Sequence, residues 1–328
     1  MNTFRWGVIG TGGIARTFTR DLSLLPDAVV TAVGSRRQES ADGFAREHGV
    51  ERAFASYEQL VSSSDVDAVY VATPHPGHHD AARLAIEAGK AVLVEKPFTL
   101  NAREAESLVA AARDRGTFLM EAMWTRFLPH VVRLREVIAS GALGEVRTVV
   151  AEHGQWFARD PEHRLFATAL GGGALLDLGI YPVSFASMVL GPPTTVTAVS
   201  DVAFTGVDAT TSVLLQHEGG AHAVITTSLE AAGANRASIA GTEARLEVDS
   251  VWYSPTTFTV RARDGREIEH FDLPHEGGGH RHQAAEVARC VREGRTESDV
   301  MPLDETVTIM ATLDEIRRQI GLVYPGER

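Results

Sequence analysis

The stretch WGVIGTGGIA, residues 6–15, decides the first part of the fold. Its apolar start is typical of a strand, and the G-x-G-x-x-A loop that follows opens a helical pattern. Gly10 permits a tight turn, Gly12 lets the backbone approach a pyrophosphate, and Ala15 lets the helix pack closely on the strand. The helix N-terminus adds N–H donors for the phosphates. This context favours dinucleotide binding over a glycine-rich turn without a ligand.

Apolar runs and helical patterns alternate from this loop to about residue 120. Ser56 with Gln59, and Asn101 with Glu104, have the spacing of helix N-caps. The alternation predicts a Rossmann-type, doubly wound parallel sheet with both faces covered. The expected strands are 6–9, 29–33, 66–72, 91–94 and 118–120, and the expected helices are 14–23, 40–48, 78–88 and 102–115.

The pattern changes near residues 121–126, where longer strand runs separated by turn pairs begin. Asp264-Gly265 between two such runs is a strong hairpin signal. We predict an α/β protein with two domains: a dinucleotide-binding domain, 1–123, and an α+β domain, 124–328, that binds substrate and oligomerises through an open, mostly antiparallel sheet. Its expected strands include 146–155, 210–217, 222–229, 258–263 and 267–271, and its expected helices are 131–139, 174–190, 283–292 and 303–320.

The composition narrows the choice of partners and compartment. A net charge of −12 argues against nucleic acid and anionic membranes, so any positive potential for a phosphate ligand must be local. The single cysteine, Cys290, needs no oxidising compartment. The N-terminus lacks the pattern of a signal peptide, and we expect no apolar stretch of the roughly 18 residues that a spanning helix needs. A cytoplasmic protein is expected.

The end of the second strand, Gly34-Ser35-Arg36-Arg37, indicates which dinucleotide is bound. Proteins that choose NAD usually place an acidic residue here to hold the ribose 2′-hydroxyl. This segment has none, whereas Ser35 and the two arginines can donate hydrogen bonds to a 2′-phosphate. The prediction is NADP, with NAD as the alternative.

Two further segments carry candidate chemistry. Glu95-Lys96-Pro97 follows a strand at the carboxyl edge of the sheet, where open α/β sheets bind ligands. Asp177 and Tyr181 are four residues apart in an apolar helical stretch, so they share one helix face and need polar partners. Pro182 predicts a kink or an irregular turn beside Tyr181.

These segments occur in the order of a known family. The glycine loop, Thr73-Pro74, Glu95-Lys96-Pro97, the segment EAMWTRF (121–127) and the segment GGALLDLGIY (172–181) resemble the glucose–fructose oxidoreductase, inositol dehydrogenase and rhizopine-catabolism (Gfo/Idh/MocA) family over essentially the whole chain. The last two segments are most similar to the branch containing dimeric dihydrodiol dehydrogenases, also known as NADP-linked D-xylose dehydrogenases.

The resemblance implies that Lys96 and Tyr181 are the catalytic pair and that Asp177 holds the substrate hydroxyl. A tyrosine acting as a base near pH 7 pays about 4 kcal/mol for its ordinary pKa of about 10. A lysine cation at about 4 Å supplies a similar energy at an effective dielectric near 20. A nearby Asp177 would oppose the tyrosinate, so the roles of Lys96 and Tyr181 could be exchanged. Many sugar-oxidising relatives have histidine in place of Tyr181, which favours the dihydrodiol and xylose branch.

The remaining candidates surround these groups. Aromatic side chains suit a sugar or cyclic diol, and the segment 157–161 is a hypothetical mobile loop over the site. The histidines lack the spacing of a metal site, so no metal is expected. The candidate cofactor residues are Gly10, Gly12, Gly13, Ile14, Ser35, Arg36, Arg37, Thr73, Pro74, His75, His78, Glu95 and Lys96. The candidate substrate residues are Trp124, Arg126, His153, Trp156, Phe157 and Asp177.

The predicted function is hydride transfer between NADP(H) and a secondary alcohol or carbonyl of a sugar or trans-dihydrodiol. The alternatives are an NAD-dependent polyol or inositol dehydrogenase and a non-catalytic NADP(H)-binding sensor. A sensor needs no proton relay, so Lys96, Asp177 and Tyr181 argue against it. The exposed face of an antiparallel sheet needs cover, so a homodimer or tetramer is expected.

Overall fold

The computed structural model describes residues 3–327, and its chain divides into two compact units. The first contains Met1–Trp124 and Glu276–Val307, and the second contains Thr125–His275 and Thr308–Arg328. Residues 276–307, which lie in the range assigned above to the second domain, thus group with the first unit. The ends of the predicted domain ranges, residues 1–2 and 328, lie outside the described residues. The functions assigned to the two ranges stay predictions.

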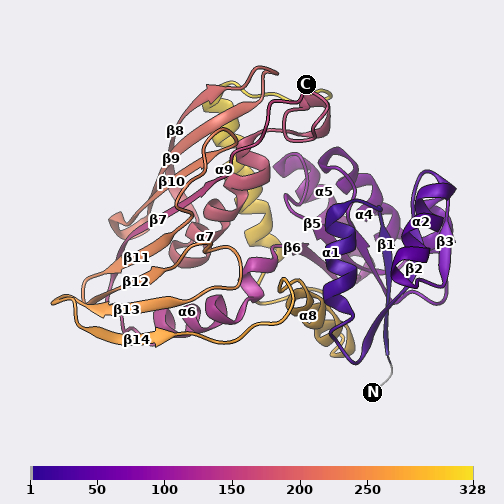
Figure 1. Cartoon of the computed structure of the whole chain (residues 1–328), viewed down its shortest axis with the longest axis horizontal. Helices are drawn as coiled ribbons and strands as arrows, with labels where there is room; N and C mark the ends of the chain where they lie inside the picture. The colour runs from indigo at the N-terminus through magenta and orange to yellow at the C-terminus, as the bar shows by residue number, and fades with distance from the viewer. Residues whose placement is uncertain (1–2, 328) are drawn as a thin grey trace. The chain divides into compact units, whose positions relative to one another are not determined.

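The first unit is built on a parallel sheet, as predicted (Figure 1). The described residues form six strands in the order β3-β2-β1-β4-β5-β6, and every neighbouring pair runs parallel. The strand order reverses between β1 and β4, and such a switch point opens a crevice at the carboxyl ends of the strands. The strands are β1 (Phe4–Ile9), β2 (Ala28–Gly34), β3 (Arg52–Phe54), β4 (Ala68–Val71), β5 (Ala91–Glu95) and β6 (Leu119–Ala122).

The helices of this unit form two groups, as in a doubly wound sheet. Helix α1 contacts α2 and α8, whereas α4 contacts α3 and α5. The predicted caps are present: the Gln59 N–H donates to Ser56 Oγ (3.3 Å), and the Glu104 N–H donates to Asn101 Oδ1 (2.9 Å). The helices are α1 (Gly13–Leu22), α2 (Gln38–His48), α3 (Tyr57–Val61), α4 (His78–Glu87), α5 (Ala102–Arg115), α8 (Arg281–Arg292) and the short η1 (His75–Gly77).

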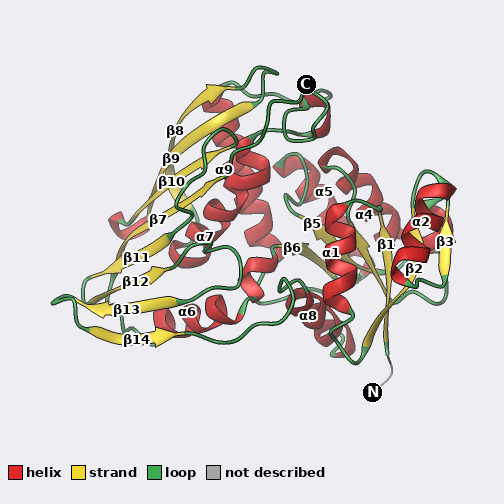
Figure 2. Ribbon diagram, viewed as in Figure 1, coloured by secondary structure: helices red, strands yellow, loops and turns green. Residues whose placement is uncertain are grey.

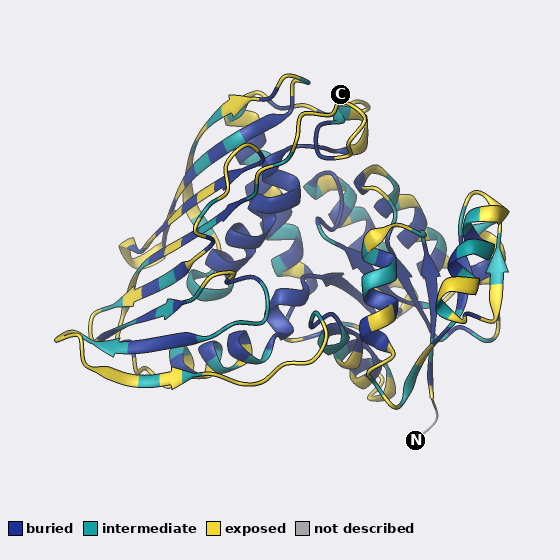
Figure 3. Ribbon diagram, in the orientation of Figure 1, coloured by how far each residue is buried: buried dark blue, intermediate teal, exposed yellow. Residues whose placement is uncertain are grey.

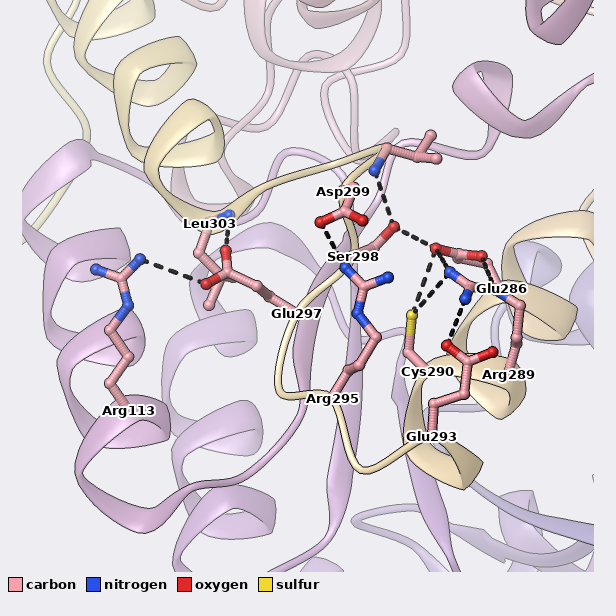
Figure 4. A network of polar contacts seen from close by, with 11 residues as sticks. Arg113, Glu286, Arg289, Cys290, Glu293, Arg295, Glu297, Ser298, Asp299 and Leu303 are labelled. Atoms are coloured by element: carbon pink, nitrogen blue, oxygen red, sulfur yellow. Dashed lines mark hydrogen bonds and ion pairs between the residues drawn. The ribbon is translucent and has the colours of Figure 1, made fainter.

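A polar network fixes the segment after α8 onto the first unit (Figure 4). Glu286 accepts hydrogen bonds from Ser298 Oγ (2.5 Å) and from the Arg289 guanidinium (2.9 and 3.0 Å). The Leu119 N–H of β6 also donates to Thr296 O (3.1 Å). The returning segment therefore covers part of the edge strand β6, where an exposed row of N–H groups would invite pairing with another chain.

The second unit is built on an open sheet whose described residues form eight strands, in the order β14-β13-β12-β11-β7-β10-β9-β8. Among these described strands, β7 and β10 form the one parallel pair, so the prediction of a mostly antiparallel sheet is confirmed. The strands are β7 (Val146–Gly154), β8 (Pro193–Val202), β9 (Asp208–His217), β10 (His222–Ser228), β11 (Ala237–Gly241), β12 (Ala244–Val248), β13 (Phe258–Ala262) and β14 (Glu267–Phe271).

Helices cover one face of this sheet (Figure 2). Helix α7 packs on β7 and β10, α9 bonds to β8 through Gln319, and α6 bonds to β14 through Arg133. The helical segments are η2 (Trp124–Phe127), α6 (Pro129–Ala139), η3 (Thr168–Leu170), η4 (Leu175–Gly179), α7 (Ile180–Leu190), η5 (Glu218–Gly220) and α9 (Leu303–Ile320).

The other face of the sheet is open, and buried and exposed residues alternate along its strands (Figure 3). Val150, Leu214 and Val224 are exposed by 43%, 46% and 43%. Strand register pairs Val224 with both of the others, so the three form one apolar row across β7, β10 and β9. A groove of about 770 Å³ lies on this face, lined in part by Val150, Val224 and Arg236.

One expectation about apolar segments is wrong. The stretch Thr168–Leu190 is 23 residues long and contains an 18-residue window with a mean hydropathy of 1.5, so by length and composition it could span a membrane. Within the described structure, 83% of this window is buried. Its apolar character therefore reflects a core helix of the second unit, which the sheet and the neighbouring helices surround.

Candidate active site

The glycine loop between β1 and α1 has the geometry of a phosphate cradle. Gly10 has a φ of +106°, and a Cβ there would lie 2.4 Å from Ala72 O, so only glycine fits. A Cβ at Gly12 or Gly13 would meet no described atom within 4 Å. Gly12 is the N-cap of α1, so the first N–H groups of the helix, from Gly13 and Ile14 onward, border this open space. These residues fit the pyrophosphate of a dinucleotide.

The turn after β2 places three polar side chains near the expected position of a ribose. The Ser35 N–H donates to Phe54 O (3.0 Å), and the Arg37 N–H contacts Ser35 Oγ at 3.5 Å. Ser35 is half-buried, whereas Arg36 and Arg37 are exposed. The segment is therefore fixed by its backbone while its cations remain accessible.

The turns after β4 and β5 are joined by a buried histidine. The two ring nitrogens of His78 lie 2.9 Å from Thr73 O and 2.8 Å from Pro97 O. The His78 side chain is fully buried, and this burial lowers the pKa of His78 although both carbonyls favour the charged ring. Pro74 precedes His75, whose ring lies 5.7 Å from that of His78. His78 therefore joins the two turns from inside the unit.

The turn that carries Lys96 is held from both sides. The Glu95 carboxyl bonds to Tyr70 Oη and accepts the Lys96 N–H (3.2 Å). Burial raises the pKa of Glu95, although the bond from Tyr70 and the charge of Lys96 oppose the change. On the other side, the Phe98 N–H donates to Glu121 Oε1 (3.2 Å). The backbone at Lys96 is thus fixed by two buried carboxyl groups.

Trp124, a predicted substrate residue, stacks on His280 at 4.3 Å between ring centroids, with 15° between the planes. The His280 and Gly278 N–H groups donate to Asp21 of α1 (2.7 and 2.9 Å). Burial alone would raise the pKa of Asp21, but the hydrogen bonds from His280 and Gly278 outweigh it and lower the pKa to about 2. The indole thus packs against a loop that α1 anchors.

In the second unit, Asp177 and Tyr181 lie on one continuous helical stretch. Asp177 lies in the π-helical turn η4, and Tyr181 lies in the first turn of α7, directly before Pro182. The predicted irregular turn beside Tyr181 is therefore present. Both residues are buried, with 4% and 8% of their whole-residue surface exposed. The mostly apolar helix thus buries a carboxylate and a phenol one turn apart.

Aromatic rings surround Tyr181. The His153 ring lies edge-on to it at 5.1 Å and stacks on Tyr253 at 3.7 Å. Gln155 Nε2 donates to His153 Nε2 (2.8 Å) and to Tyr253 Oη (3.4 Å). Burial raises the pKa of Tyr253 to about 12, so this phenol stays neutral. His153 was predicted, whereas Gln155 and Tyr253 were missed, because nothing in the sequence links β7 to the segment before β13.

Asp177 is held by a residue that the sequence did not indicate. Arg164 Nη1 donates to Asp177 Oδ1 (2.8 Å) and Arg164 Nη2 donates to Asp177 Oδ2 (3.2 Å). A Cβ at Gly172 would lie 2.8 Å from Arg164 O, so the glycine run lets the two backbones approach closely. That glycine run was the one available signal of a close approach, but it does not name the partner.

The other predicted substrate residues have clear structural contacts. Arg126 is buried and donates to Ser184 Oγ (3.1 Å) and Ser184 O (2.8 Å), which ties η2 to α7 one turn beyond Tyr181. Phe157 is half-buried against a cluster that includes Phe166, whereas the Trp156 side chain is 66% exposed. Arg126 thus positions the helix that carries Tyr181.

A second anchor holds the start of this helix. Asp208 Oδ2 accepts the Leu175 N–H (2.7 Å) and Thr211 Oγ1 (2.8 Å), and Tyr324 Oη donates to Gly172 O (2.6 Å). Burial raises the pKa of Asp208 to about 6. The glycine run 171–173 and the start of η4 are therefore fixed by residues that are distant in the sequence.

A glycine loop of this geometry on a Rossmann-type sheet is characteristic of dinucleotide-binding proteins. Family comparison agrees. Residues 4–123 match the model described as "Oxidoreductase family, NAD-binding Rossmann fold", and residues 131–247 match the GFO/IDH/MocA C-terminal domain. The chain belongs to the Gfo/Idh/MocA family and is an NAD(P)-dependent dehydrogenase.

Similar proteins extend over the full length. The chain is 40% identical to the trans-1,2-dihydrobenzene-1,2-diol dehydrogenases of Bos taurus and Homo sapiens, covering 99% of each chain. It is 31% identical to KijD10, a 3-ketoreductase from Actinomadura kijaniata in complex with NADP and TDP-benzene, with a TM-score of 0.84 and coverage of 97% and 98%. An aldose–aldose oxidoreductase from Caulobacter crescentus is 26% identical, with a TM-score of 0.88 and coverage of 97% of each chain.

Proposed function

We propose that this protein transfers hydride between NADP(H) and a secondary alcohol or carbonyl of a sugar or trans-dihydrodiol, with Lys96 and Tyr181 as the acid/base pair. The observation that carries the proposal is the burial of Asp177 and Tyr181 one turn apart, beside stacked aromatic rings. Such a site offers an acceptor for a hydroxyl group and flat apolar surfaces for a ring.

A bound nicotinamide supplies the hydride acceptor for the substrate C–H bond. This chain's residues handle the other hydrogen: the substrate hydroxyl gives its proton to Tyr181 as its carbon–oxygen bond becomes a carbonyl. The Lys96 cation stabilises the tyrosinate that accepts the proton. The charge of Asp177, which by itself would oppose the tyrosinate, is offset by the paired Arg164 guanidinium. In reduction, Tyr181 returns the proton.

The preference for NADP rests on the turn after β2. Ser35, Arg36 and Arg37 carry donors and positive charge, and Gly34–Arg37 contains no acidic residue. KijD10 in complex with NADP gives this preference further support. Gly10, Gly12, Gly13 and Ile14 are proposed to hold the pyrophosphate.

Other predicted cofactor residues line the turns after β4 and β5. Thr73, Pro74 and His75 are proposed to border the cofactor, together with Glu95 and Lys96. Because His78 is fully buried, we propose that it holds these turns in place without touching the ligand.

The substrate class follows from the aromatic surroundings of Tyr181 and from the relatives. Full-length relatives at 40% identity are named trans-1,2-dihydrobenzene-1,2-diol dehydrogenases, and a structural neighbour is an aldose–aldose oxidoreductase. Both names describe substrates with neighbouring hydroxyl groups. We further propose a homo-oligomer formed through the open sheet face, and a cytoplasmic location.

The test is a substrate panel assayed at 340 nm with NADP and with NAD, comparing wild type with Lys96→Met and Tyr181→Phe. Trans-1,2-dihydrobenzene-1,2-diol, D-xylose, myo-inositol and an α-dicarbonyl compound form the panel. We expect turnover of a diol or sugar with NADP, and a loss of kcat of at least about 100-fold in each variant with unchanged cofactor affinity.

Matched controls are Lys90→Arg, at the one other lysine of the sequence, and Tyr57→Phe, at a half-buried tyrosine of α3. Both are expected to keep wild-type turnover. Near-normal kcat in the Lys96 and Tyr181 variants would refute the mechanism. Turnover of myo-inositol with NAD would favour a polyol dehydrogenase, and cofactor binding without any turnover would favour a sensor.

A further inference from the structure

The Arg164–Asp177 pair joins a buried carboxylate to a largely exposed guanidinium. The Asp177 side chain is 6% exposed, whereas the Arg164 side chain is 55% exposed. Two N–H···O contacts, of 2.8 and 3.2 Å, connect each terminal nitrogen to a different carboxylate oxygen. This bidentate arrangement is the geometry in which arginine binds carboxylates most specifically. The cation therefore lies between the buried carboxylate and solvent.

The backbone around the pair is built to hold this arrangement. Gly173 N–H donates to Leu165 O (2.8 Å), and a Cβ at Gly172 would come within 2.7 Å of that same carbonyl. The side chains of Leu165 and Phe166, directly after Arg164, are buried in the core of the second unit. Arg164 thus projects from an anchored backbone, and its position over Asp177 does not depend on the long side chain alone.

The chemistry of the pair suits a hydroxyl group, which can donate and accept at the same time. A carboxylate accepts hydrogen bonds only, and a guanidinium donates only, through five N–H groups in a planar fork. One edge of such a fork can hold a carboxylate while another binds a further oxygen. A hydroxyl that donates to Asp177 can therefore accept a hydrogen bond from Arg164 through its own oxygen.

We propose that Arg164, acting with Asp177, is a specificity-determining residue that selects substrates with oxygens on two adjacent carbons: vicinal diols and α-hydroxycarbonyl compounds. Tyr181 takes the proton of the hydroxyl that reacts, while the hydroxyl on the neighbouring carbon donates to Asp177 and accepts from Arg164. This inference rests on the proposed function, because it assigns the substrate class of the same site.

The experiment measures discrimination between matched substrates that differ by one oxygen. The pairs are trans-cyclohexane-1,2-diol against cyclohexanol, and D-xylose against 2-deoxy-D-xylose. For each pair the ratio of kcat/KM values is determined in wild type, Arg164→Gln and Arg164→Lys. In Arg164→Gln the ratio should fall by about 10- to 100-fold, the usual effect of losing one hydrogen bond to a charged group. Arg164→Lys should restore part of the ratio, because it keeps the charge without the fork.

Two further measurements separate specificity from a structural role. Arg159→Gln removes another exposed arginine of the same segment, whose guanidinium pairs with Glu230 at 3.2 Å. It should leave the ratio at the wild-type value. Inhibition constants for cyclohexanol should be equal in wild type and Arg164→Gln, whereas a distorted site would weaken binding of both substrates alike.

The outcomes distinguish the two proposals. If wild type oxidises neither pair, the proposed function fails, and this inference fails with it. If wild type prefers the dioxygenated substrates and Arg164→Gln keeps the full preference, the inference fails alone. A lower ratio in Arg164→Gln, with partial recovery in Arg164→Lys, supports it.

Discussion

A single buried carboxyl group, Asp208, links the helical stretch η4–α7 to the core of the second unit. Its Oδ2 atom accepts the Leu175 N–H and Thr211 Oγ1, while its Oδ1 atom has no hydrogen-bond partner among residues 3–327. A buried charge with one unsatisfied oxygen is costly. Burial therefore raises the pKa of this carboxyl to about 6, although the two hydrogen bonds that it accepts favour the charged form.

This predicts a pH dependence of stability. In the unfolded chain the carboxyl has its ordinary pKa near 4, so the folded state binds the proton more tightly. The stability from this group is fully present below pH 4 and is lost as the pH rises through 6. The difference in pKa corresponds to about 3 kcal/mol at pH 7.

Urea unfolding of wild type and Asp208→Asn, measured from pH 4 to pH 7, checks this expectation. The free energy of unfolding of wild type relative to the variant should fall by about 2 kcal/mol over that range, because part of the change already occurs near pH 4. The same comparison with Asp201→Asn, at an exposed residue of β8, should stay flat. A pH-independent difference for Asp208→Asn would show that the carboxyl is ionised throughout.

At this scale the sequence predicted residues that share an element and missed residues that only the tertiary fold brings together. Asp177 and Tyr181 were predicted because helical spacing places them on one face. Arg164 and Tyr253 reach them from a loop and from the segment before β13, and no periodic pattern specifies such contacts. The glycine run 171–173 permits a close approach of another backbone, but it does not specify which one.

At the scale of elements, the turn between β2 and α2 tests the cofactor preference. Replacing Arg36 and Arg37 by alanine should raise the Kd for NADP by at least about 10-fold, because charge-assisted hydrogen bonds to the 2′-phosphate are lost. The Kd for NAD should not change. Isothermal titration or nicotinamide fluorescence measures both constants.

The matched control removes two exposed arginines elsewhere in the same unit, with Arg46→Ala in α2 and Arg103→Ala in α5. It loses the same formal charge, so it should change both affinities only slightly. Equal weakening of NADP binding in the control would mean that the affinity depends on the net charge of the protein and not on the position of the arginines in this turn. Unchanged NADP affinity in the Arg36 and Arg37 variant would refute the preference.

The sequence predicted most elements of both sheets, because their signals are local. Caps such as Asn101 and turn pairs such as Asp264-Gly265 determine where helices and strands end. The parallel pairing of β10 with β7 was not predicted, because strand order depends on contacts between distant segments. The return of α8 to the first unit was not predicted either, because it also depends on contacts between distant segments.

At the scale of the whole molecule, the open sheet face predicts self-association. The apolar row of Val150, Leu214 and Val224 is exposed on a face that no described helix of its unit covers. Exposed apolar patches of this kind mark protein interfaces. Light scattering coupled to gel filtration should show a dimer or tetramer for wild type.

Leu214→Glu with Val224→Glu places two like charges in the row and should yield a monomer. A control with the same charge change, Val29→Glu with Val132→Glu, alters exposed valines on other elements and should keep the wild-type mass. A monomeric wild-type protein would contradict the proposed oligomer. An unchanged mass in the Leu214 and Val224 variant would place the interface elsewhere.

The interleaving of the two units along the chain has a consequence for biosynthesis. The first unit needs Glu276–Val307 and the second needs Thr308–Arg328, which includes the Tyr324 anchor. Most of both units is therefore synthesised before either unit is complete. Neither unit can finish folding until the other is almost fully synthesised. Nascent chains halted before residue 276 should expose both unfinished sheets at the same time. A chaperone that binds such a chain would therefore bind both units together.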